Sequence, residues 1–319
     1  MTFAGSQDRI EARLVPEAGF ELDTFRVSGL PRRPGLGLLR ALGVAAVAPA
    51  ACLRILARRR PDIVLGGGGY VAGPMVVAAR LRRIPVALME ADSHLGLANR
   101  LAAPFARRMF LAFPVAGRCG EKYRVTGRPI PARSVGGSRA EARRLFELPE
   151  DGPVLLVFGG SQGAQSLNEL AVESFGSSGP AVLHLAGERD YEALRMRVQR
   201  PDYRLLTYSH EFGAALAASD LALARAGGSV WELAAASKPA ILVPYPHATA
   251  DHQTGNARFF EEAGGAVLVP QSELGRVPEL VHSLLGDPER LAAMGDAMRR
   301  TARPQAAEEI AEELIQLAV

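Results

Sequence analysis

A unit made of a buried strand, a glycine-rich turn and a helix recurs three times in this chain of 319 residues, and no other feature restricts the fold so strongly. The units lie within residues 62–90, 154–186 and 221–244, and each closes with a second strand. Strands that alternate with helices of this length form parallel sheets joined by right-handed crossovers. A chain of this size suits about two domains. The sequence therefore predicts an α/β protein with two Rossmann-like, doubly wound parallel-sheet domains that face a cleft.

The division between the domains is expected near residue 128, because residues 127–137 are rich in glycine and proline and come after a strand at 123–126. We expect a first domain over 1–128 and a second over 129–319. Within the three units, helices are predicted over about 74–82, 165–174 and 230–236. A last helix over about 305–318 has glutamates on one side and apolar residues on the other. That pattern predicts that it packs back on the first domain.

Cysteine and histidine usage limits the classes of protein to consider. The chain has two cysteines, Cys52 and Cys119, which cannot form a disulfide framework, so we expect a cytoplasmic protein. The six histidines show no spacing typical of a zinc site. No Asp-x-Asp pair is present to hold a nucleotide sugar through a metal. We therefore predict no metal and no cofactor.

Positive charge is concentrated between Thr24 and Pro61, where eight arginines occur without any acidic residue. An apolar stretch inside this segment is interrupted by Arg40 and Pro49, so it is too broken for a transmembrane helix. Apolar side chains ringed by arginines can instead lie on an anionic bilayer. Phe25 is the single aromatic residue of the segment, too few for stacking on successive bases, and we expect no nucleic-acid partner. A core helix with solvated arginines is the open alternative.

The turn at residues 159–164 is the most informative motif. It comes after the buried strand 154–158 and opens a helix, so its glycines let the backbone approach a ligand while the first amides of the helix point outward. The turn matches neither the dinucleotide pattern nor the P-loop, since it lacks a subsequent Gly-Lys-Ser/Thr. It favours a nucleotide diphosphate held without a metal. An ordinary strand-to-helix turn is the alternative.

Polar side chains gather after other strands as well. Glu232 lies one helical turn after the glycines at 227–228, where its carboxylate can reach a ribose diol. Residues 244–256 carry amides and carboxylates of the kind that bind sugar hydroxyls. Glu90, Asp92 and His94 lie at the carboxyl end of a strand of the first domain and can orient or deprotonate an acceptor hydroxyl. An exposed surface glutamate at 232 and a helix cap at Asp92 or Ser93 are the alternatives.

Together these segments resemble the MurG family, the UDP-GlcNAc transferases that convert lipid I to lipid II in peptidoglycan synthesis. The likeness rests on residues 68–74, 96–99, 159–164, 225–235 and 251–257 and covers nearly the whole chain. It implies a fold of the glycosyltransferase B type, with UDP-GlcNAc in the second domain and the undecaprenyl-linked acceptor on the first. It also implies a cytoplasmic enzyme bound peripherally to the inner face of the cell membrane through residues 24–61.

The resemblance assigns roles residue by residue. Ser161 and its neighbours resemble pyrophosphate contacts, Ser209 a uracil contact, Glu232 the ribose ligand and Gln253 a contact to the transferred sugar. The expected donor-binding residues are Gly160, Ser161, Gln162, Gly163, Ser209, Arg225, Gly227, Gly228, Ser229, Glu232, Gln253, Asn256 and Asp92. The expected acceptor-binding residues are Gly67, Gly68, Gly69, Tyr70, His94 and Asn99. Glu90 is the expected catalytic assistant in an inverting transfer to the acceptor 4-hydroxyl.

The chain also departs from the family pattern. The family arginine of Gly-Asn-Pro-Val-Arg is replaced by Pro131, which displaces it to Arg128 or Arg133. The family begins with a strand and a Gly-Gly-Thr-Gly-Gly-His turn, whereas Thr2–Arg9 here resembles the family segment immediately after that unit. We expect that Met1 is a misassigned start or that the chain is truncated, and that the main base lies outside it. A related glycolipid glycosyltransferase, a UDP-GlcNAc 2-epimerase and a non-catalytic nucleotide-sugar-binding protein remain open alternatives.

Overall fold

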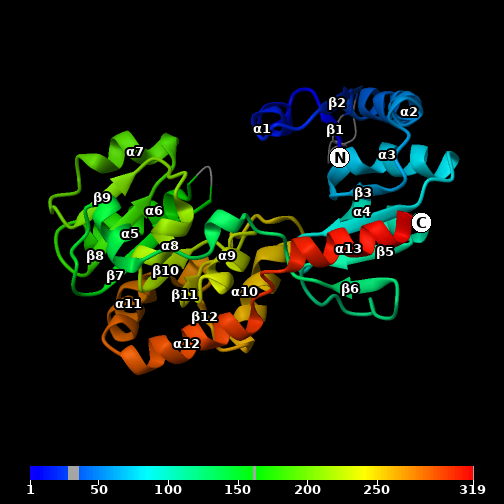
Figure 1. Ribbon diagram of the computed structural model, residues 1–319. Coiled ribbons are helices and arrows are strands. Elements are labelled where there is room, and N and C mark those ends of the chain that lie inside the picture. Colours follow the sequence, from blue (N-terminus) through cyan, green and yellow to red (C-terminus); the bar gives the residue numbers. More distant parts are fainter. Residues whose placement is uncertain (28–35, 161–162, 319) are drawn as a thin grey trace. The chain divides into compact units, whose positions relative to one another are not determined.

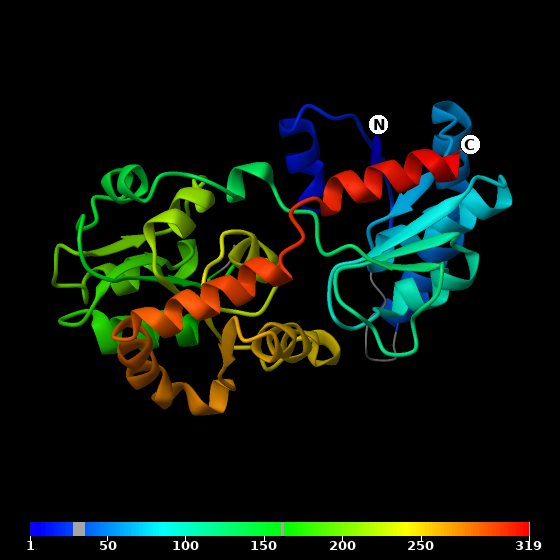
Figure 2. The same ribbon diagram turned by 60° about the horizontal axis from the view of Figure 1, so that its bottom comes forward.

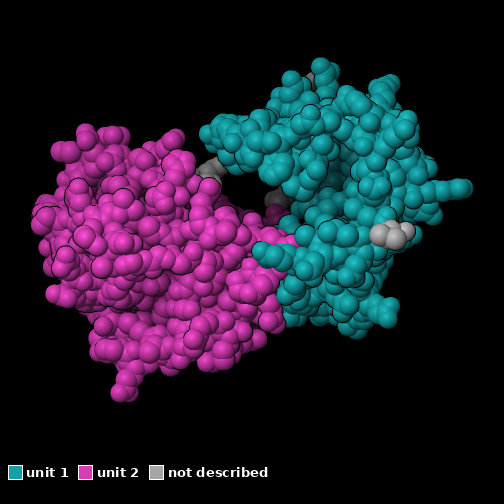
Figure 3. Space-filling view, in the orientation of Figure 1, with its two compact units in different colours: residues 1–126, 308–319 teal, residues 127–307 magenta. Residues whose placement is uncertain are grey.

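The computed structural model describes residues 1–27, 36–160 and 163–318 (Figure 1). The chain forms two compact units (Figure 3): the first comprises Met1–Thr126 and Glu308–Val319, and the second comprises Gly127–Ala307. The chain leaves the first unit two residues before the boundary expected at 128. Each unit has its own core.

The second unit is built on a six-stranded parallel sheet in the order β12-β11-β10-β7-β8-β9, which Figures 1 and 2 show among its helices. Its strands are β7 (Val154–Phe158), β8 (Ala181–Leu185), β9 (Tyr203–Leu206), β10 (Leu221–Ala224), β11 (Ala240–Leu242) and β12 (Ala266–Leu268). Its helices are α5 (Arg139–Leu145), α6 (Gln165–Phe175), α7 (Glu188–Arg195), α8 (Phe212–Ala218), α9 (Val230–Ala235), α10 (His252–Glu262), α11 (Val277–Leu285) and α12 (Pro288–Thr301). The strand order runs outward from β7 to one edge and from β10 to the other. The adjacent pair β7 and β10 is therefore the switch point, outside whose carboxyl ends open α/β sheets bind ligands.

The core of the second unit explains the unbroken apolar runs of its central strands. Every residue of β7 and β10 is buried. Leu155 and Val157 contact a cluster that includes Leu167 of α6 and Val281 of α11. Strands covered on both faces have no polar face to show, so their sequences read as continuous hydrophobic segments.

The first unit contains two parallel sheets. One has two strands, β1 (Phe3–Ser6) and β2 (Leu22–Phe25), and the other has the order β3-β4-β5-β6. The four-stranded sheet consists of β3 (Val64–Gly66), β4 (Val86–Glu90), β5 (Arg108–Leu111) and β6 (Tyr123–Val125). The helices are α1 (Glu11–Glu17), α2 (Leu36–Arg59), α3 (Gly69–Leu81) and α4 (Leu97–Ala102).

Helix α3 begins earlier than the sequence predicts. Pro74 is the expected start, because proline is common in the first turn of helices. The helix begins instead at Gly69, directly after Gly68, whose φ of 87° turns the chain out of β3. Pro74 therefore lies inside the helix. The buried face of α3, which includes Met75 and Val76, packs in the same core cluster as Leu88 of β4.

The structure of helix α2 bears on whether the arginine-rich region is a membrane-contacting segment or a core helix. Its second half is a core helix, because Cys52 and Leu56 are 0% and 3% exposed. Arg59 donates to Glu21 at 2.6 Å and to Asp23 at 2.7 Å, and Arg58 also pairs with Asp23. The charge at this end is thus opposed by acids that lie just outside the segment. Within the described residues, no helix combines the length and the apolarity that crossing a bilayer requires.

The last helix, α13 (Ala306–Ala318), packs against the four-stranded sheet of the first unit (Figures 1 and 2). Ile310, with Leu314 beside it, contacts a small cluster formed by Ala87 and Phe110. Glu313 pairs with Arg108 at 2.8 Å and with Arg124 at 3.1 Å. The helix therefore joins the first unit through an apolar stripe and a flanking ion-pair network.

Candidate functional site

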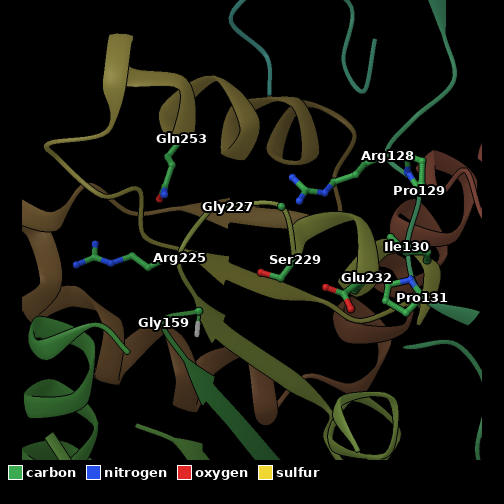
Figure 4. A pocket seen from close by; sticks show the side chains of 12 residues that line it. Arg128, Pro129, Ile130, Pro131, Gly159, Arg225, Gly227, Ser229, Glu232 and Gln253 are labelled. Carbon is green, nitrogen blue, oxygen red and sulfur yellow. The ribbon is translucent and has the colours of Figure 1, made fainter. Parts of the chain in front are cut away.

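A cavity of about 670 Å³ opens in the second unit beyond the carboxyl ends of β7 and β10, at the switch point of its sheet (Figure 4). The residues that line it come from three segments of the chain and from Gln253. They are Arg128, Pro129, Ile130, Pro131, Gly159, Gly160, Arg225, Gly227, Gly228, Ser229, Glu232 and Gln253. The cavity thus combines two glycine turns, a carboxylate and guanidinium groups.

The turn after β7 requires glycine at three positions. A Cβ on Gly159 would lie 2.3 Å from Cβ of Ala164, and one on Gly163 would lie 2.0 Å from the carbonyl oxygen of Ala186. Gly160 and Gly163 have φ values of 93° and 72°, in the left-handed region that favours glycine. The predicted contacts Ser161 and Gln162 lie outside the described residues. The described part of the turn brings the chain tightly back from β7 into α6.

Behind this turn, a hydrogen-bond network holds the start of α6 to β8. Asn168 donates to the carbonyl of Ala186 at 2.8 Å, and its Oδ1 lies 2.9 Å from Nε2 of His184. The other ring nitrogen of His184 lies 2.8 Å from the Tyr203 hydroxyl. Burial lowers the pKa of His184 to about 3, so its ring is neutral and structural, as the mid-strand position suggests.

Arg225, which directly follows β10, is 8% exposed, and its guanidinium is hydrogen-bonded within the protein. It donates to the carbonyls of Val243 and Pro244, and also to Ser166 Oγ at 2.8 Å and Gln271 Oε1 at 2.6 Å. Burial lowers the pKa of its guanidinium, and in Figure 4 that group points away from Arg128 and Glu232. Arg225 therefore ties β10, β11 and α6 together behind the cavity that it lines.

Arg128 is the cation that faces the cavity. Its guanidinium lies against the second turn, since a Cβ on Gly228 would be 2.2 Å from its Nη1. Among the described residues it has no hydrogen bond or ion pair, and Figure 4 shows it directed toward Gly227. Arg133, the other candidate for the displaced family arginine, is exposed and does not line the cavity.

Glu232 lies in the first turn of α9, a helix that begins directly after Ser229. Its Oε1 accepts a hydrogen bond from Ser134 Oγ at 2.6 Å. Ser134 was not identified from the sequence, because it belongs to the segment 127–137 that reads as a linker. No local pattern could have identified it, since the bond joins residues 98 positions apart.

Helix α10, which begins after the loop that follows β11, contributes one cavity residue. Gln253 Oε1 accepts from the backbone N–H of Tyr245 at 2.9 Å, and a Cβ on Gly227 would lie 3.9 Å from its Nε2. Asn256 is fully buried and donates to the carbonyl of Ala226 at 3.1 Å, so it supports the turn from behind. Ser209 lies after β9, and its Oγ accepts from the N–H of Glu211. Neither Asn256 nor Ser209 lines the cavity.

In the first unit, Glu90 organises the loop after β4. Its Oε1 accepts from the N–H of Ala91 at 3.0 Å, and its Oε2 accepts from Gly96 N at 2.9 Å and Asn99 Nδ2 at 3.0 Å. The side chain is 8% exposed. These hydrogen bonds engage both carboxylate oxygens within the protein. The geometry therefore supports a positioning role for Glu90.

The remaining predicted residues of the first unit lie around that loop and the turn after β3. Gly68 and Gly69 have φ values of 87° and 68°, and Tyr70 comes next at the start of α3. A Cβ on Gly68 would lie 3.3 Å from Asn99 Nδ2, so the turn and the Glu90 loop are adjacent. His94 is exposed, and Asp92 lies in the same loop. The remaining residue, Gly67, precedes Gly68 in the turn.

Comparison with known proteins gives matches over most of the chain. Residues 2–111 match the N-terminal domain of glycosyltransferase family 28, and residues 154–310 match the C-terminal domain of that family. A Rubrobacter xylanophilus protein is 40% identical over 99% of this chain and 94% of its own length. A Halothermothrix orenii protein is 36% identical over 95% of this chain and 87% of its own length. Both are named UDP-N-acetylglucosamine–N-acetylmuramyl-(pentapeptide) pyrophosphoryl-undecaprenol N-acetylglucosamine transferase.

Solved structures resemble the chain over almost its whole length. MurG of Acinetobacter baumannii has a TM-score of 0.78 at 26% identity, covering 99% of this chain and 90% of that one. UDP-GlcNAc 2-epimerase of Neisseria meningitidis, solved with UDP-GlcNAc, has a TM-score of 0.66 at 15% identity over 98% of this chain and 90% of that one. The second likeness concerns the fold alone. The two-domain α/β architecture is thus that of the glycosyltransferase B type.

Proposed function

Because this chain belongs to glycosyltransferase family 28, we propose that it transfers N-acetylglucosamine from UDP-N-acetylglucosamine to the 4-hydroxyl of the muramic acid sugar of lipid I, which gives lipid II. The names of relatives up to 40% identical support this reaction. Binding of the donor is supported by one observation, the cavity at the switch point of the six-stranded sheet, which is lined by two glycine turns and a carboxylate.

The donor nucleotide is assigned to this cavity. The backbone amides of Gly159 and Gly160 and of the turn at 227–229 face the diphosphate, and the positive ends of α6 and α9 lie behind them. Glu232 accepts hydrogen bonds from the ribose hydroxyls, and Gln253 Nε2 donates to the transferred sugar. Arg128 is the cation available to the diphosphate, because its guanidinium lines the cavity without a partner in the described part of the chain.

The reaction is a direct displacement. The acceptor hydroxyl attacks the anomeric carbon and gives its proton to a general base, the bond between that carbon and the diphosphate oxygen breaks, and UDP leaves with inversion. Negative charge that develops on the leaving group meets preorganised amides and Arg128, which takes the place of a metal ion. A favourably placed helix terminus contributes up to about 2 kcal/mol to such a charge.

The acceptor is assigned to the first unit. The turn at Gly67–Tyr70 offers backbone amides to the acceptor diphosphate, and the loop held by Glu90 borders it. Glu90 acts by fixing the loop that carries Asp92 and His94, because its own oxygens already accept several N–H groups.

The first unit also carries the contact with the inner face of the membrane. Helix α3 packs against both α2 and α4, and beyond the arginine-rich segment α3 exposes Leu81 at 66% and α4 exposes Leu97 and Leu101 at 63% and 67%. Exposed arginines accompany them: Arg80, Arg82, Arg83 and Arg100. Each basic residue near an anionic bilayer adds about 1 kcal/mol of attraction. Apolar and cationic side chains on adjoining helices suit peripheral attachment.

The reaction is tested by incubating the protein with UDP-N-acetylglucosamine and lipid I in anionic vesicles, with and without a chelator. We expect UDP and a disaccharide-linked lipid with inverted anomeric configuration, formed equally in both arms. A 2-epimerase would release UDP with lipid I absent, and a glycolipid glycosyltransferase would prefer a diacylglycerol acceptor. Either product, or a strict need for a divalent cation, would reject the proposal.

A further inference from the structure

Ser134 makes a short hydrogen bond to the one carboxylate that lines the donor cavity in the described part of the chain. Its Oγ donates to Glu232 Oε1 at 2.6 Å. Ser134 is 3% exposed, whereas Glu232 is only partly buried and borders the cavity. The bond therefore joins a fixed buried donor to a side chain that is otherwise free to move.

The segment that carries Ser134 is anchored independently of Glu232. Ser134 ends the short helix η2 (Ala132–Ser134), and its N–H donates to the carbonyl of Pro131 at 2.9 Å. The η2 segment lies tightly against α8, where a Cβ on Gly213 would be 2.0 Å from the carbonyl oxygen of Arg133 and 3.2 Å from Cα of Ser134. The hydroxyl is thus presented from a rigid support, which is what a site of defined geometry requires.

The hydrogen bond leaves the other carboxylate oxygen available. Within the described residues, Glu232 Oε2 accepts no hydrogen bond, and Oε1 accepts one. A glutamate has three rotatable bonds, and a ligand that had to order them would bind less tightly. Because the serine hydroxyl holds Oε1, the carboxylate is already oriented, with Oε2 open to two adjacent hydroxyl groups of a ligand.

We infer that Ser134 is a positioning residue for the donor nucleotide, which fixes Glu232 to accept both ribose hydroxyls and so sets the preference for ribonucleotides over deoxyribonucleotides. The inference rests on the proposed function, because it takes the ligand of the cavity to be UDP. A purely structural serine would affect folding and the binding of all nucleotides alike. A positioning serine affects only nucleotides that carry the diol.

The experiment measures calorimetric dissociation constants for UDP and for its 2′,3′-dideoxy analogue in the wild type and four variants. Ser134→Ala should weaken UDP binding about tenfold and change binding of the analogue less than about twofold, as expected for loss of a hydrogen bond to a charged group. Ser134→Thr keeps the hydroxyl and should stay within about threefold of the wild type for UDP. Ser138→Ala, a matched change at the exposed cap of α5, should alter neither constant.

Glu232→Gln separates failure of this inference from failure of the proposed function. If Glu232→Gln removes the preference for UDP while Ser134→Ala keeps it, the donor site stands and the role of Ser134 is wrong. If Ser134→Ala weakens both ligands equally, the serine is structural and the inference is again overturned. If Glu232→Gln changes neither constant, the carboxylate does not contact the ribose, and the donor site and the inference fail together.

Discussion

Replacing Gly228 with alanine should remove a cation from the cavity without damaging the fold. A Cβ at this position would lie 2.2 Å from Arg128 Nη1, 2.3 Å from Cζ and 2.8 Å from Nη2. Ordinary contact begins near 3.4 Å, so the guanidinium must retreat by more than an ångström. Gly228 does not have a left-handed φ, so the backbone accepts a side chain. The displaced group is the end of a flexible side chain, and we expect the free energy of unfolding to change by less than about 1 kcal/mol.

Displacing the Arg128 guanidinium should weaken binding of the diphosphate group. A hydrogen bond to a charged group contributes about 1.5–3 kcal/mol, so the dissociation constant for UDP should rise between about 10-fold and 150-fold. Binding of uridine, which has no phosphate, should be unchanged. Isothermal titration calorimetry with UDP and uridine separates the two effects.

Gly227 provides the matched control. A Cβ there has Gln253 Nε2 as its nearest neighbour, at 3.9 Å, so Gly227→Ala should leave UDP affinity within about threefold of the wild type. Arg128→Gln should reproduce the loss seen in Gly228→Ala, and the double variant should be no weaker than either single one, because both remove the same contact. Equal effects at 227 and 228, or additive effects at 128 and 228, would refute the reasoning.

Other parts of the structure make further predictions. Gln253→Ala should raise KM for UDP-N-acetylglucosamine about fivefold or more and leave UDP affinity within about twofold; equal losses for both ligands would contradict the sugar contact. Ile310→Ala should lower the free energy of unfolding in urea by about 2–4 kcal/mol, since the side chain is 4% exposed; a loss under about 0.5 kcal/mol would mean that α13 is not docked. Burial holds the pKa of His184 at about 3 in the folded chain, below its unfolded value of about 6.5. Between about pH 3 and pH 6.5 the unfolded state therefore binds more protons than the folded state, and the free energy of unfolding should fall by up to about 1.4 kcal/mol for each unit that the pH is lowered. His184→Gln should reduce this pH dependence, and an identical pH dependence in the variant and the wild type would contradict the prediction.

The sequence predicts the second unit well because its central strands β7 and β10 are buried on both faces and lead into glycine-rich turns. The helix predicted over 165–174 is α6, Gln165–Phe175, and the strand predicted over 154–158 is β7. The first unit is harder, since Pro74 suggests a helix start that the chain has already made at Gly69. A proline inside a helix gives no local sign of where the helix begins.

The site is predictable where a motif is local and hidden where contacts are long-range. Gly227, Gly228 and Glu232 lie within a few residues of each other, so their spacing indicates part of the cavity. Asn256 is suitable by residue type, yet it bonds to the carbonyl of Ala226 from inside the core. Ser134 and Arg128 belong to a segment whose glycines and prolines resemble a linker, and only the folded chain brings them to the cavity.

Both ends of the chain belong to the first unit, so the second unit is in effect inserted into it. A fragment that stops at Thr126 would lose Ile310 and Glu313 and would uncover the apolar surface that they protect. Residues 127–307, by contrast, retain their complete sheet. Reporter groups fused to the two termini would both be attached to the first unit. A measurement of motion between the two units therefore needs one label within residues 127–307.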